Sequence, residues 1–303
     1  MKTYLILNPN AGSAEQSTAL QEVIATQADL VLRETTRAGQ GRELAREALQ
    51  GGYECIVAAG GDGTINEVVN GLAPDFASAR LGIIPLGTGN DLARTLAIPT
   101  DPVEAVSILT TGQERQLDVM KIEAANQVVY GLNIAAGGFT GQMNEVLTDE
   151  LKKTWGPLAY LIGTASVFPN LTEYETTITW NPGQAERIEA LNIIVANGRT
   201  AAGGFHVAPT ANPEDGLLDI VIVRSGSFVD LAGISAQLLA GSYLDNEHVL
   251  HPRVQRLTIA SRPGMWFNVD GELLTKEPLT FTVCPQALRV VVGSTYTPTP
   301  DMP

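Results

Sequence analysis

The feature that most constrains this chain is a loop with three glycines that directly follows a short apolar run. Residues 55–59 have the length and composition of a buried strand, and residues 60–67 then read Gly-Gly-Asp-Gly-Thr-Ile-Asn-Glu. Glycines permit positive φ and let a phosphate approach main-chain N–H groups without a Cβ in the way. The loop therefore predicts the phosphate-binding edge of an α/β sheet.

The aspartate inside this loop indicates which kind of phosphate chemistry to expect. Asp62 places a carboxylate where the phosphates are expected, which is favourable only if a cation or a transferable proton lies between them. Thr64 and Glu67 have the spacing of a capping box, so a helix is expected to begin at Thr64. A structural turn needs one glycine rather than three around an aspartate, which favours magnesium-nucleotide chemistry over a plain turn.

A second loop of the same kind follows the predicted strand 81–84. It reads Gly87-Thr88-Gly89-Asn90-Asp91, with Asn90 or Thr88 as the cap of a helix and Asp91 in its first turn. A cap alone explains Asn90 but does not explain a second glycine-framed acidic loop on an adjacent strand.

Three further polar loops are weaker signals when each is taken alone. Asn10 follows the first predicted strand and Thr35 the second, and either position is explained by an ordinary turn. The segment Asp270-Gly271-Glu272 also fits a hairpin turn. If the second half of the chain folds over the first, its two carboxylates provide a candidate base for a substrate hydroxyl.

The segment from Asn212 to Leu217 contains Asp215 and reads Asn-Pro-Glu-Asp-Gly-Leu. Its carboxylate and carbonyl oxygens are suitable ligands for Mg²⁺ or Ca²⁺. An acidic surface turn is an equally good explanation. His248 and His251 have no accompanying Cys or Glu-His motif, so they do not predict a zinc site.

Composition limits the class of protein. Of 303 residues, 44% are hydrophobic and 17% charged, which indicates a globular fold with a substantial core. The formal net charge of −14 argues against general nucleic-acid binding. Cys55 and Cys284 lie in apolar runs and are expected to be buried thiols in a reducing compartment. No transmembrane helix is expected, and the start of the chain is too short for a signal peptide.

The order of elements changes along the chain. Up to about residue 115, strands alternate with helices, which predicts a parallel sheet covered on both faces. Beyond it, many short strands with Gly, Pro and Asn turns predict an antiparallel sandwich. The expected domains are 1–118 and 119–292, with a tail at about 293–303 free to return to the first. The predicted strands are 4–7, 30–34, 55–59, 81–84, 115–122, 128–134, 174–180, 189–196, 217–223, 256–260, 266–269, 279–283 and 288–292; the predicted helices are 16–26, 41–49, 64–70, 157–168 and 227–240.

Several nucleotide and hydrolase motifs do not occur in the sequence. A Walker A motif, a Gly-x-Gly-x-x-Gly after a strand and a Gly-x-Ser-x-Gly nucleophile elbow are all missing. Walker-type ATPases and dinucleotide-binding Rossmann enzymes are therefore disfavoured.

Residues 59–71 together with residues 82–94 look like the diacylglycerol kinase catalytic domain. Asn8-Pro9, residues 133–138, Asn197-Gly198, Asp215-Gly216 and residues 270–272 fit the same family in order. The whole chain thus resembles the soluble bacterial lipid kinases, which are related to diacylglycerol, sphingosine and ceramide kinases. Gly-Gly-Asp-Gly-Thr alone also occurs in NAD kinases, whereas Pro-Leu-Gly-Thr-Gly-Asn-Asp does not.

The resemblance implies a phosphofructokinase-like α/β domain followed by an antiparallel β-sandwich, with ATP between them. It places two Mg²⁺ sites: one at Asp62 and Asp91, and a structural one at Asp215 with the carbonyls of Asn212 and Leu217. Asn212 replaces the family's usual basic residue, which leaves the carbonyl ligand in place. The resemblance also implies that the proton acceptor is Asp270 or Glu272 and that Asp62 is catalytic. The positions implied for ATP are Asn10, Thr35, Gly60, Gly61, Asp62, Gly63, Thr64, Asn66, Thr88 and Asp91.

The hypothesis is an ATP- and Mg²⁺-dependent kinase of phospholipid biosynthesis that phosphorylates a lipid hydroxyl, diacylglycerol first among the acceptors, to give phosphatidic acid. A sphingoid or other lipid kinase, or an NAD kinase, is the alternative, and a non-catalytic nucleotide- or lipid-binding regulator is a further one. The expected location is the cytoplasm, with peripheral contact to the inner face of the membrane. Residues 152–168, which include Trp155, fit a membrane-docking patch and a core helix equally well. The sequence leaves a homodimer open.

Overall fold

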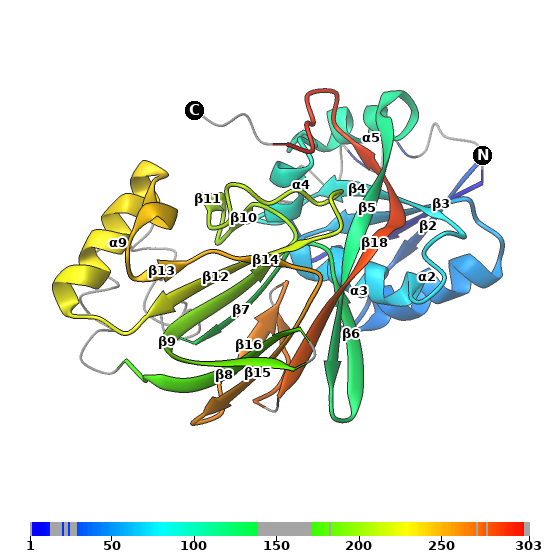
Figure 1. Ribbon diagram of the computed structural model, residues 1–303. Coiled ribbons are helices and arrows are strands. Elements are labelled where there is room, and N and C mark those ends of the chain that lie inside the picture. The colour runs from blue at the N-terminus through cyan, green and yellow to red at the C-terminus, as the bar shows by residue number, and fades with distance from the viewer. Residues whose placement is uncertain are drawn as a thin grey trace.

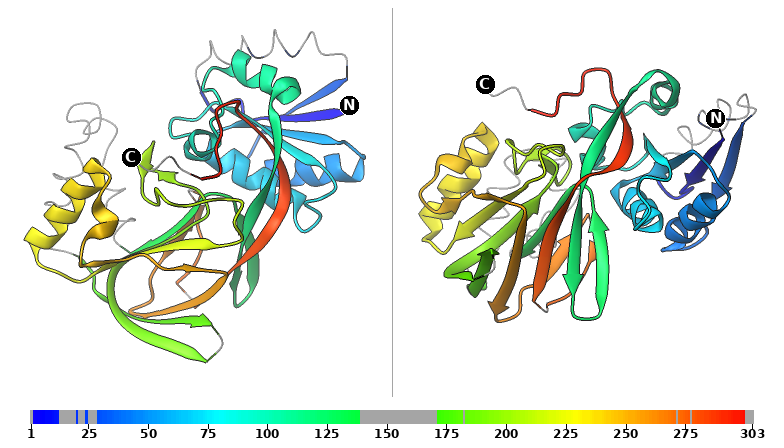
Figure 2. Two further views of the ribbon diagram at one scale, coloured as in Figure 1. Left: turned by 45° about the horizontal axis from the view of Figure 1, so that its top comes forward. Right: turned by 45° about the vertical axis from the view of Figure 1, so that its right-hand side comes forward.

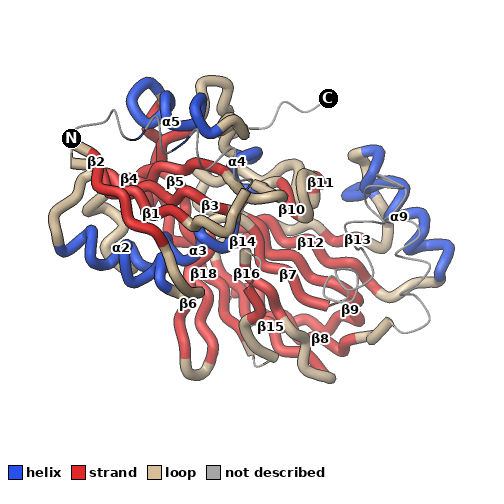
Figure 3. The backbone as a smooth tube through the Cα atoms, turned by 180° about the vertical axis from the view of Figure 1, so that it is seen from behind, coloured by secondary structure: helices blue, strands red, loops and turns tan. Residues whose placement is uncertain are grey.

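The computed structural model describes residues 2–12, 20, 24, 29–138, 171–181, 183–270, 272–276 and 278–299 of the 303-residue chain. Figure 1 shows two lobes on either side of two long strands, β5 (Gln113–Ala124) and β18 (Leu279–Val292). In the described part of the chain, sixteen strands form one continuous sheet through both lobes, which Figure 3 shows from behind.

The first lobe is a parallel sheet with helices on both faces, as the sequence predicts. Its strand order is β2-β1-β3-β4, followed by β18. In Figures 1 and 2, α2 and α3 lie on one side of this sheet and α5 on the other. The bounds are β1 (Thr3–Leu7), β2 (Leu30–Glu34), α2 (Gln40–Gln50), β3 (Cys55–Gly60), α3 (Asp62–Leu72), β4 (Arg80–Pro85), α4 (Asp91–Thr95) and α5 (Pro102–Thr111).

The second lobe is antiparallel, which confirms the predicted change of architecture. Strand β9 pairs with β7, β8 and β12, and β15 pairs with β8 and β18. The bounds are β6 (Gln127–Gly131), β7 (Ile134–Gly138), β8 (Tyr174–Asn181), β9 (Gln184–Ala196), β10 (Thr200–Ala201), β11 (Phe205–His206), β12 (Leu218–Arg224), α9 (Phe228–Ala240), η2 (Tyr243–Asp245), β13 (Val249–Leu250), β14 (Arg253–Val254), β15 (Arg256–Arg262), β16 (Phe267–Val269) and β17 (Glu272–Leu273).

Strand β18 joins the two hydrophobic cores. Its first half contributes Phe281 to the core of the second lobe, and its second half contributes Val290 to the core of the first. Beyond it the chain stays on the first lobe, because Gly293 N donates to Leu96 O at 3.0 Å and Tyr296 is buried in the same core. Figure 2 shows this C-terminal segment running back over the junction of the lobes.

Two strand predictions are wrong, each because of a contact distant in sequence. The expected strand 128–134 is interrupted at residues 132–133, where Leu132 and Ile134 donate their N–H groups to Asp270. The strands expected at 279–283 and 288–292 are one strand, β18, because its partner β5 is itself long enough to pair with both parts across a bulge.

The helix predictions need two corrections, and two further helix predictions are not tested. Helix α3 begins at Asp62 rather than Thr64, and α5 was missed although Asp101 caps it through Val103 N and Glu104 N at 2.9 Å. The expected helix 16–26 lies largely outside the described residues, and the expected helix 157–168 lies wholly outside them.

The two cysteines differ in burial. Cys55 is fully buried, as predicted, whereas Cys284 is only partly buried; both are free thiols whose pKa is raised by desolvation. In the part of the chain that the structure describes, no helix is long and apolar enough to span a bilayer.

A pair of glycine substitutions tests the close packing of α2 on α3. A Cβ at Gly71 would lie 2.5 Å from Arg42 O and 2.6 Å from Ala45 Cβ, whereas a Cβ at Gly233 in α9 meets no atom within 4 Å. We expect Gly71→Ala to lower the free energy of unfolding by about 1–3 kcal/mol. The matched Gly233→Ala should raise it by about 0.5–1 kcal/mol. Urea denaturation measures both, and equal stabilisation by the two variants would contradict the close contact.

Candidate functional site

The glycine loops of the first lobe meet at one edge of the parallel sheet. Leu7 pairs with Ala59, and Gly60 pairs with Pro85, so β1, β3 and β4 end side by side. The loops then approach without side chains between them, since a Cβ on Gly87 would lie 2.6 Å from the Cα of Gly61. A Cβ on Gly61 would lie 3.3 Å from the Cα of Gly87, so the contact excludes a side chain at position 87 and leaves little room for one at position 61.

The loop after β3 is not closed by the predicted capping box. Gly61 is the N-cap residue of α3 and no side chain caps the helix. Glu67 instead accepts hydrogen bonds from Gly39 N and Gly41 N, both at 2.7 Å, and so fixes the start of α2. Thr64 accepts from Asn8 Nδ2 at 3.2 Å, which ties the loop after β1 to α3. At the second loop, Asn90 occupies the N-cap position of α4, but its side chain donates to Gly87 O at 2.7 Å.

Asp62 and Asp91 are brought together, as the sequence predicts. A Cβ on Gly89 would lie 3.1 Å from Asp62 Oδ2 and 3.3 Å from Asp91 Oδ2, so both carboxylates face this glycine. Burial is the largest cause that raises the pKa of Asp91, and the negative charge of Asp62 raises it further. Hydrogen bonds from Gly203 and Gly204 act in the opposite direction.

Asp91 also binds the second lobe, which the sequence did not indicate. Gly203 N donates to its two oxygens at 3.1 and 3.0 Å, and Gly204 N donates to Oδ1 at 2.7 Å. Thr200 Oγ1 donates to the Asp91 carbonyl at 2.8 Å. Short helix α4 is thus hydrogen-bonded to the turn between β10 and β11. The consecutive glycines at 203 and 204 were the available signal.

Asp270 lies at the end of β16 with a φ of 46°, a conformation uncommon for a residue with a side chain. Its carboxylate accepts three hydrogen bonds: from Ile134 N at 2.9 Å, Leu132 N at 3.1 Å and Asn66 Nδ2 at 3.2 Å. Asp270, which follows β16, therefore points its carboxylate toward α3 of the first lobe.

The acidity of Asp270 reflects two opposing effects. Desolvation raises its pKa from 3.8 to about 6, assisted by the charge of Asp62, although the hydrogen bonds from Ile134, Asn66 and Leu132 lower it. Because the pKa is higher in the folded state, this group favours the fold below about pH 4 and loses that contribution as the pH rises through about 6.

Asn66 and Asn70 form the first-lobe side of this contact. Asn66 Nδ2 donates to Asp270 Oδ2 at 3.2 Å and to Tyr130 O at 3.3 Å. Asn70 Nδ2 donates to Tyr130 O at 2.8 Å, and its Oδ1 accepts from Tyr130 N at 2.9 Å. One face of α3 therefore binds both β6 and Asp270, which connects the glycine loop before α3 to the second lobe.

The other predicted nucleotide residues lie at the same edge but differ in exposure. Thr35 is buried and its N–H donates to Leu7 O at 2.8 Å, whereas Thr88 is exposed. Asn10 is exposed and its N–H donates to Asn8 Oδ1 at 3.0 Å. The backbone of Glu272 belongs to β17, and its side chain lies outside what the structure describes.

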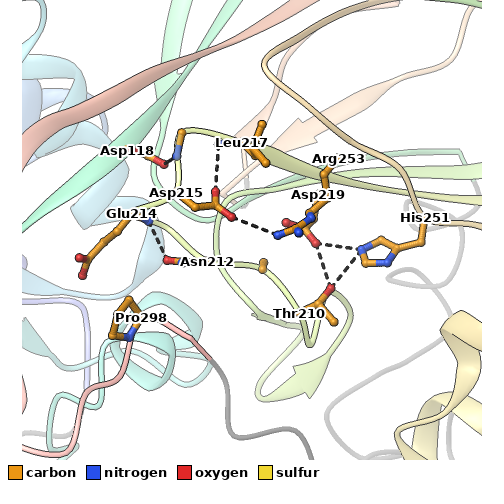
Figure 4. A network of polar contacts seen from close by, with 12 residues as sticks. Asp118, Thr210, Asn212, Glu214, Asp215, Leu217, Asp219, His251, Arg253 and Pro298 are labelled. Atoms are coloured by element: carbon orange, nitrogen blue, oxygen red, sulfur yellow. Dashed lines mark hydrogen bonds and ion pairs between the residues drawn. The ribbon is translucent and has the colours of Figure 1, made fainter.

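The predicted second metal site lies apart from this edge, in the network of Figure 4. Asp215 accepts from Leu217 N at 3.0 Å and forms an ion pair with Arg253 at 3.1 Å. The Asn212 carbonyl accepts from Asp215 N at 3.4 Å. A metal ion on Asp215 would therefore compete with the guanidinium of Arg253.

Asp118 of β5 holds this loop in place, a role that no motif in the sequence indicates. Its fully buried carboxylate accepts from Gly216 N and Gln286 N, both at 2.7 Å, and its N–H donates to Pro213 O at 2.7 Å. Burial raises its pKa, against the effect of these two hydrogen bonds.

His251 has a structural environment rather than the partners of a zinc ligand. Its Nε2 lies 2.9 Å from Asp219 Oδ1 and 3.3 Å from Thr210 Oγ1 (Figure 4). His248 faces a different carboxylate, Asp230, at 3.8 Å. Among the described residues, no three His, Cys, Asp or Glu side chains are grouped closely enough to hold a metal ion.

Two family models match the chain in succession. Residues 2–122 match the diacylglycerol kinase catalytic domain, and residues 133–292 match the YegS C-terminal NAD kinase beta sandwich-like domain. The two matches follow the change from parallel to antiparallel strands.

Relatives cover almost the whole chain. The diacylglycerol kinase of Staphylococcus carnosus is 31% identical over 301 residues, which are 98% of this chain and 95% of that one. A Pseudomonas aeruginosa protein named "Probable lipid kinase YegS-like" is 35% identical over 290 residues, 95% and 93% of the two chains. A crystal structure of a diacylglycerol kinase from Bacillus anthracis superposes with a TM-score of 0.80 at 25% identity and covers 98% of both chains.

Two glycine loops of the first lobe carry Asp62 and Asp91, and the antiparallel lobe contributes Asp270. This arrangement is consistent with the kinase class that these matches define. The chain belongs to the diacylglycerol kinase catalytic-domain family of lipid kinases, which includes the YegS-like proteins. The resemblance drawn from the two glycine loops is confirmed, as is the fold class.

Replacement of Asn66 tests its control of the Asp270 carboxyl. In Asn66→Ala the pKa of Asp270 should move above about 6, because a hydrogen bond to the ionised form is lost. The measurement is an NMR titration of ¹³C-labelled aspartate carboxyls.

Asn70→Ala is the matched control for that titration. It loses the bonds to Tyr130 and those that its Nδ2 donates to Asn66 O and Oδ1 at 2.9 and 3.2 Å, but it leaves the Asn66 amide itself in place. We expect it to cost about 1–3 kcal/mol of stability and to move the Asp270 midpoint less than Asn66→Ala does. Equal midpoints in Asn66→Ala and the wild type would contradict the assigned contact.

Proposed function

We propose that the protein transfers the terminal phosphoryl group of ATP to a lipid hydroxyl, with diacylglycerol as the acceptor and phosphatidic acid as the product. One observation supports this most strongly. Asp62 and Asp91 both face Gly89 at the edge of the sheet, and α3, which begins at Asp62, binds the Asp270 carboxylate of the second lobe through Asn66 at 3.2 Å. Phosphoryl transfer needs such positioning and charge control more than covalent catalysis.

The nucleotide would lie over the two glycine loops. A Cβ at Gly63 would meet no atom within 4 Å, which leaves open space beside the start of α3 for phosphates. The close contact of Gly61 with Gly87 brings main-chain N–H groups of two loops to this place. Asn10, Thr35, Thr64 and Thr88 lie around the same edge and are proposed to complete the ATP site.

Asp62 and Asp91 fit a magnesium ion held partly through water. One oxygen of each carboxylate lies near Gly89, and two carboxylates grouped in this way favour a divalent cation between them. When bound, Mg²⁺ offsets the charge of the phosphates. Both oxygens of the Asp91 carboxylate already accept hydrogen bonds from the backbone N–H groups of Gly203 and Gly204. The Asp62 carboxylate therefore has the oxygen that is more available to a metal ion.

Asp270 is proposed as the proton acceptor. Its carboxylate is held by three donors, and a pKa of about 6 keeps it ionised near neutral pH while leaving it more basic than an ordinary aspartate. The acceptor hydroxyl would approach from the second lobe, opposite Asp62. Glu272 remains the alternative acceptor from the same turn.

The second proposed magnesium site, at Asp215 with the carbonyls of Asn212 and Leu217, would be structural. Burial raises the pKa of Asp215, while the charge of Arg253 lowers it. The donor oxygens suit Mg²⁺, but Arg253 already compensates the carboxylate, so occupancy requires Arg253 to move.

The lipid acceptor places the reaction at a membrane. We propose that the enzyme works in the cytoplasm and meets its substrate at the inner face of the bilayer as a peripheral protein in phospholipid synthesis. A sphingoid base or another lipid alcohol is the second candidate acceptor. NAD is a third, since the model matched by residues 133–292 is described as NAD kinase-like.

Removing either carboxylate should abolish turnover. Asp62→Asn and Asp270→Asn are expected to lower kcat by about 10²–10⁴-fold, since each removes a charge that acts at the reacting groups. Asp75→Asn, at an exposed position after α3, is the matched control. Unchanged melting temperatures would separate chemistry from folding, and full activity in either variant would refute that residue's role.

The pH profile tests the base directly. Because Asp270 must be ionised, kcat/KM should increase as the pH rises through about 6 and then level off. Steady-state assays in buffers of constant ionic strength measure this, and a profile without an acid limb near that pH would argue against Asp270 as the base.

An acceptor screen tests the substrate class. Diacylglycerol, sphingosine, a ceramide and NAD are offered with Mg-ATP, and products are detected by mass spectrometry. We expect phosphatidic acid. A different phosphorylated product would replace diacylglycerol as the acceptor, and ATP binding with no product from any acceptor would favour the regulator hypothesis.

A further inference from the structure

The proposed site contains an imbalance of charge. Asp62, Asp91 and Asp270 contribute three carboxylates, and a triphosphate adds more negative charge. One Mg²⁺ compensates only part of this. Since the transition state of phosphoryl transfer spreads charge over the moving phosphoryl oxygens, a positive side chain is expected beside them.

Two arginines follow strands at the carboxyl edge of the parallel sheet. Arg37, after β2, is bound by both oxygens of Glu43 at 2.8 and 2.6 Å and is thereby neutralised. Arg94, on α4, has no carboxylate within ion-pair distance among the described residues. Its Nε donates to Gly89 O at 3.1 Å, which leaves the two terminal amino groups of the guanidinium without a described acceptor.

The position of Arg94 is set from both lobes. Gly89, whose carbonyl it binds, is the residue that faces Asp62 and Asp91. On the other side, a Cβ at Gly204 would lie 3.5 Å from Arg94 Cδ and Nε, so the side chain packs along this glycine. Arg94 lies on the same short helix as Asp91, three residues further along the chain.

We propose that Arg94 is a catalytic residue whose guanidinium binds the terminal phosphates of the nucleotide and stabilises the charge of the transferring group. This inference rests on the proposed kinase function. Gly89 and Gly204 hold the Cδ and Nε atoms of the side chain in place. The exposed terminal amino groups of the guanidinium remain free to donate two parallel hydrogen bonds. An arginine suits this task because its planar fork matches two phosphate oxygens, which the single ammonium of lysine does not.

A purely structural role would have different consequences. If Arg94 only linked Gly89 to the Gly203–Gly204 turn, its loss would weaken every nucleotide equally through the shape of the loop. A phosphate contact instead acts on ATP and leaves AMP unaffected.

The test compares nucleotide affinities in Arg94→Gln, Arg94→Lys and Arg94→Ala with those of the wild type. Arg46→Gln, at an exposed arginine of α2 with no described contact, is the matched control. Calorimetry with Mg-ATP and with AMP needs no lipid acceptor. We expect Arg94→Gln to weaken Mg-ATP binding by about 10–100-fold, as for a hydrogen bond to a charged group, with AMP affinity unchanged.

Turnover with the lipid acceptor gives the second readout. In Arg94→Ala, kcat should fall by about 100-fold or more, and millimolar guanidinium chloride should restore part of it. Arg94→Lys retains the positive charge but cannot donate two parallel hydrogen bonds. Its kcat should therefore stay below that of Arg94→Ala in the presence of guanidinium chloride. Thermal melting of each variant checks that the fold persists.

The outcomes separate this inference from the proposed function. Wild-type Mg-ATP affinity and kcat in Arg94→Gln, or an equal loss of ATP and AMP binding, would overturn the role of Arg94 while leaving the kinase assignment intact. A wild-type protein that binds no Mg-ATP would overturn both. Selective loss of ATP binding together with guanidinium rescue would support the assignment.

Discussion

The hydrogen bond from the Asn66 amide to the Asp270 carboxylate joins the two lobes at the candidate site, in addition to the continuous strands β5 and β18. It connects α3, which follows the first glycine loop, with the turn after β16, 204 residues away in sequence. The same carboxylate accepts the N–H groups of Leu132 and Ile134, on the two sides of the break between β6 and β7. The sheet is therefore deformed where the two lobes meet. A residue with positive φ and a desolvated charge is unfavourable for folding, so its surroundings must compensate it, and such sites are concentrated where proteins function.

Much of the fold could be predicted from the sequence because its signals are local. Apolar runs of strand length, alternating with helical segments, were sufficient for the parallel sheet, and short strands with turn residues were sufficient for the antiparallel lobe. Predictions failed where a distant group decided the outcome. The strand expected at 128–134 is broken by Asp270, and Glu67 binds the start of α2 instead of capping its own helix. Such competition for backbone N–H groups cannot be read from spacing along the chain.

The candidate site was predictable to a similar extent. Asp62, Asp91 and Asp270 stood out because each lies in or beside a glycine-containing turn. Their partners did not, since Asn70, Thr200 and the Gly203–Gly204 turn have no signature apart from the adjacent glycines. Helix periodicity places Asn66 and Asn70 on one face, but it does not show that this face is occupied by β6 and Asp270. Polar residues on one helix face are therefore a useful signal only once the neighbouring strands are known.

In the proposed mechanism Asp91 has two partners, the Gly203–Gly204 turn and a magnesium ion, and both require the same charge state of its carboxyl group. Backbone N–H groups from Gly203 and Gly204 bind its ionised form, and a magnesium ion also binds the ionised form. Both partners thus favour deprotonation, against the burial and the nearby Asp62 that raise its pKa. The turn of the second lobe consequently stabilises the charge state that a metal requires. On this reasoning the junction of the lobes and the proposed nucleotide site are one structure, and a change at the Gly203–Gly204 turn would alter the affinity of the proposed magnesium site without replacing Asp62 or Asp91.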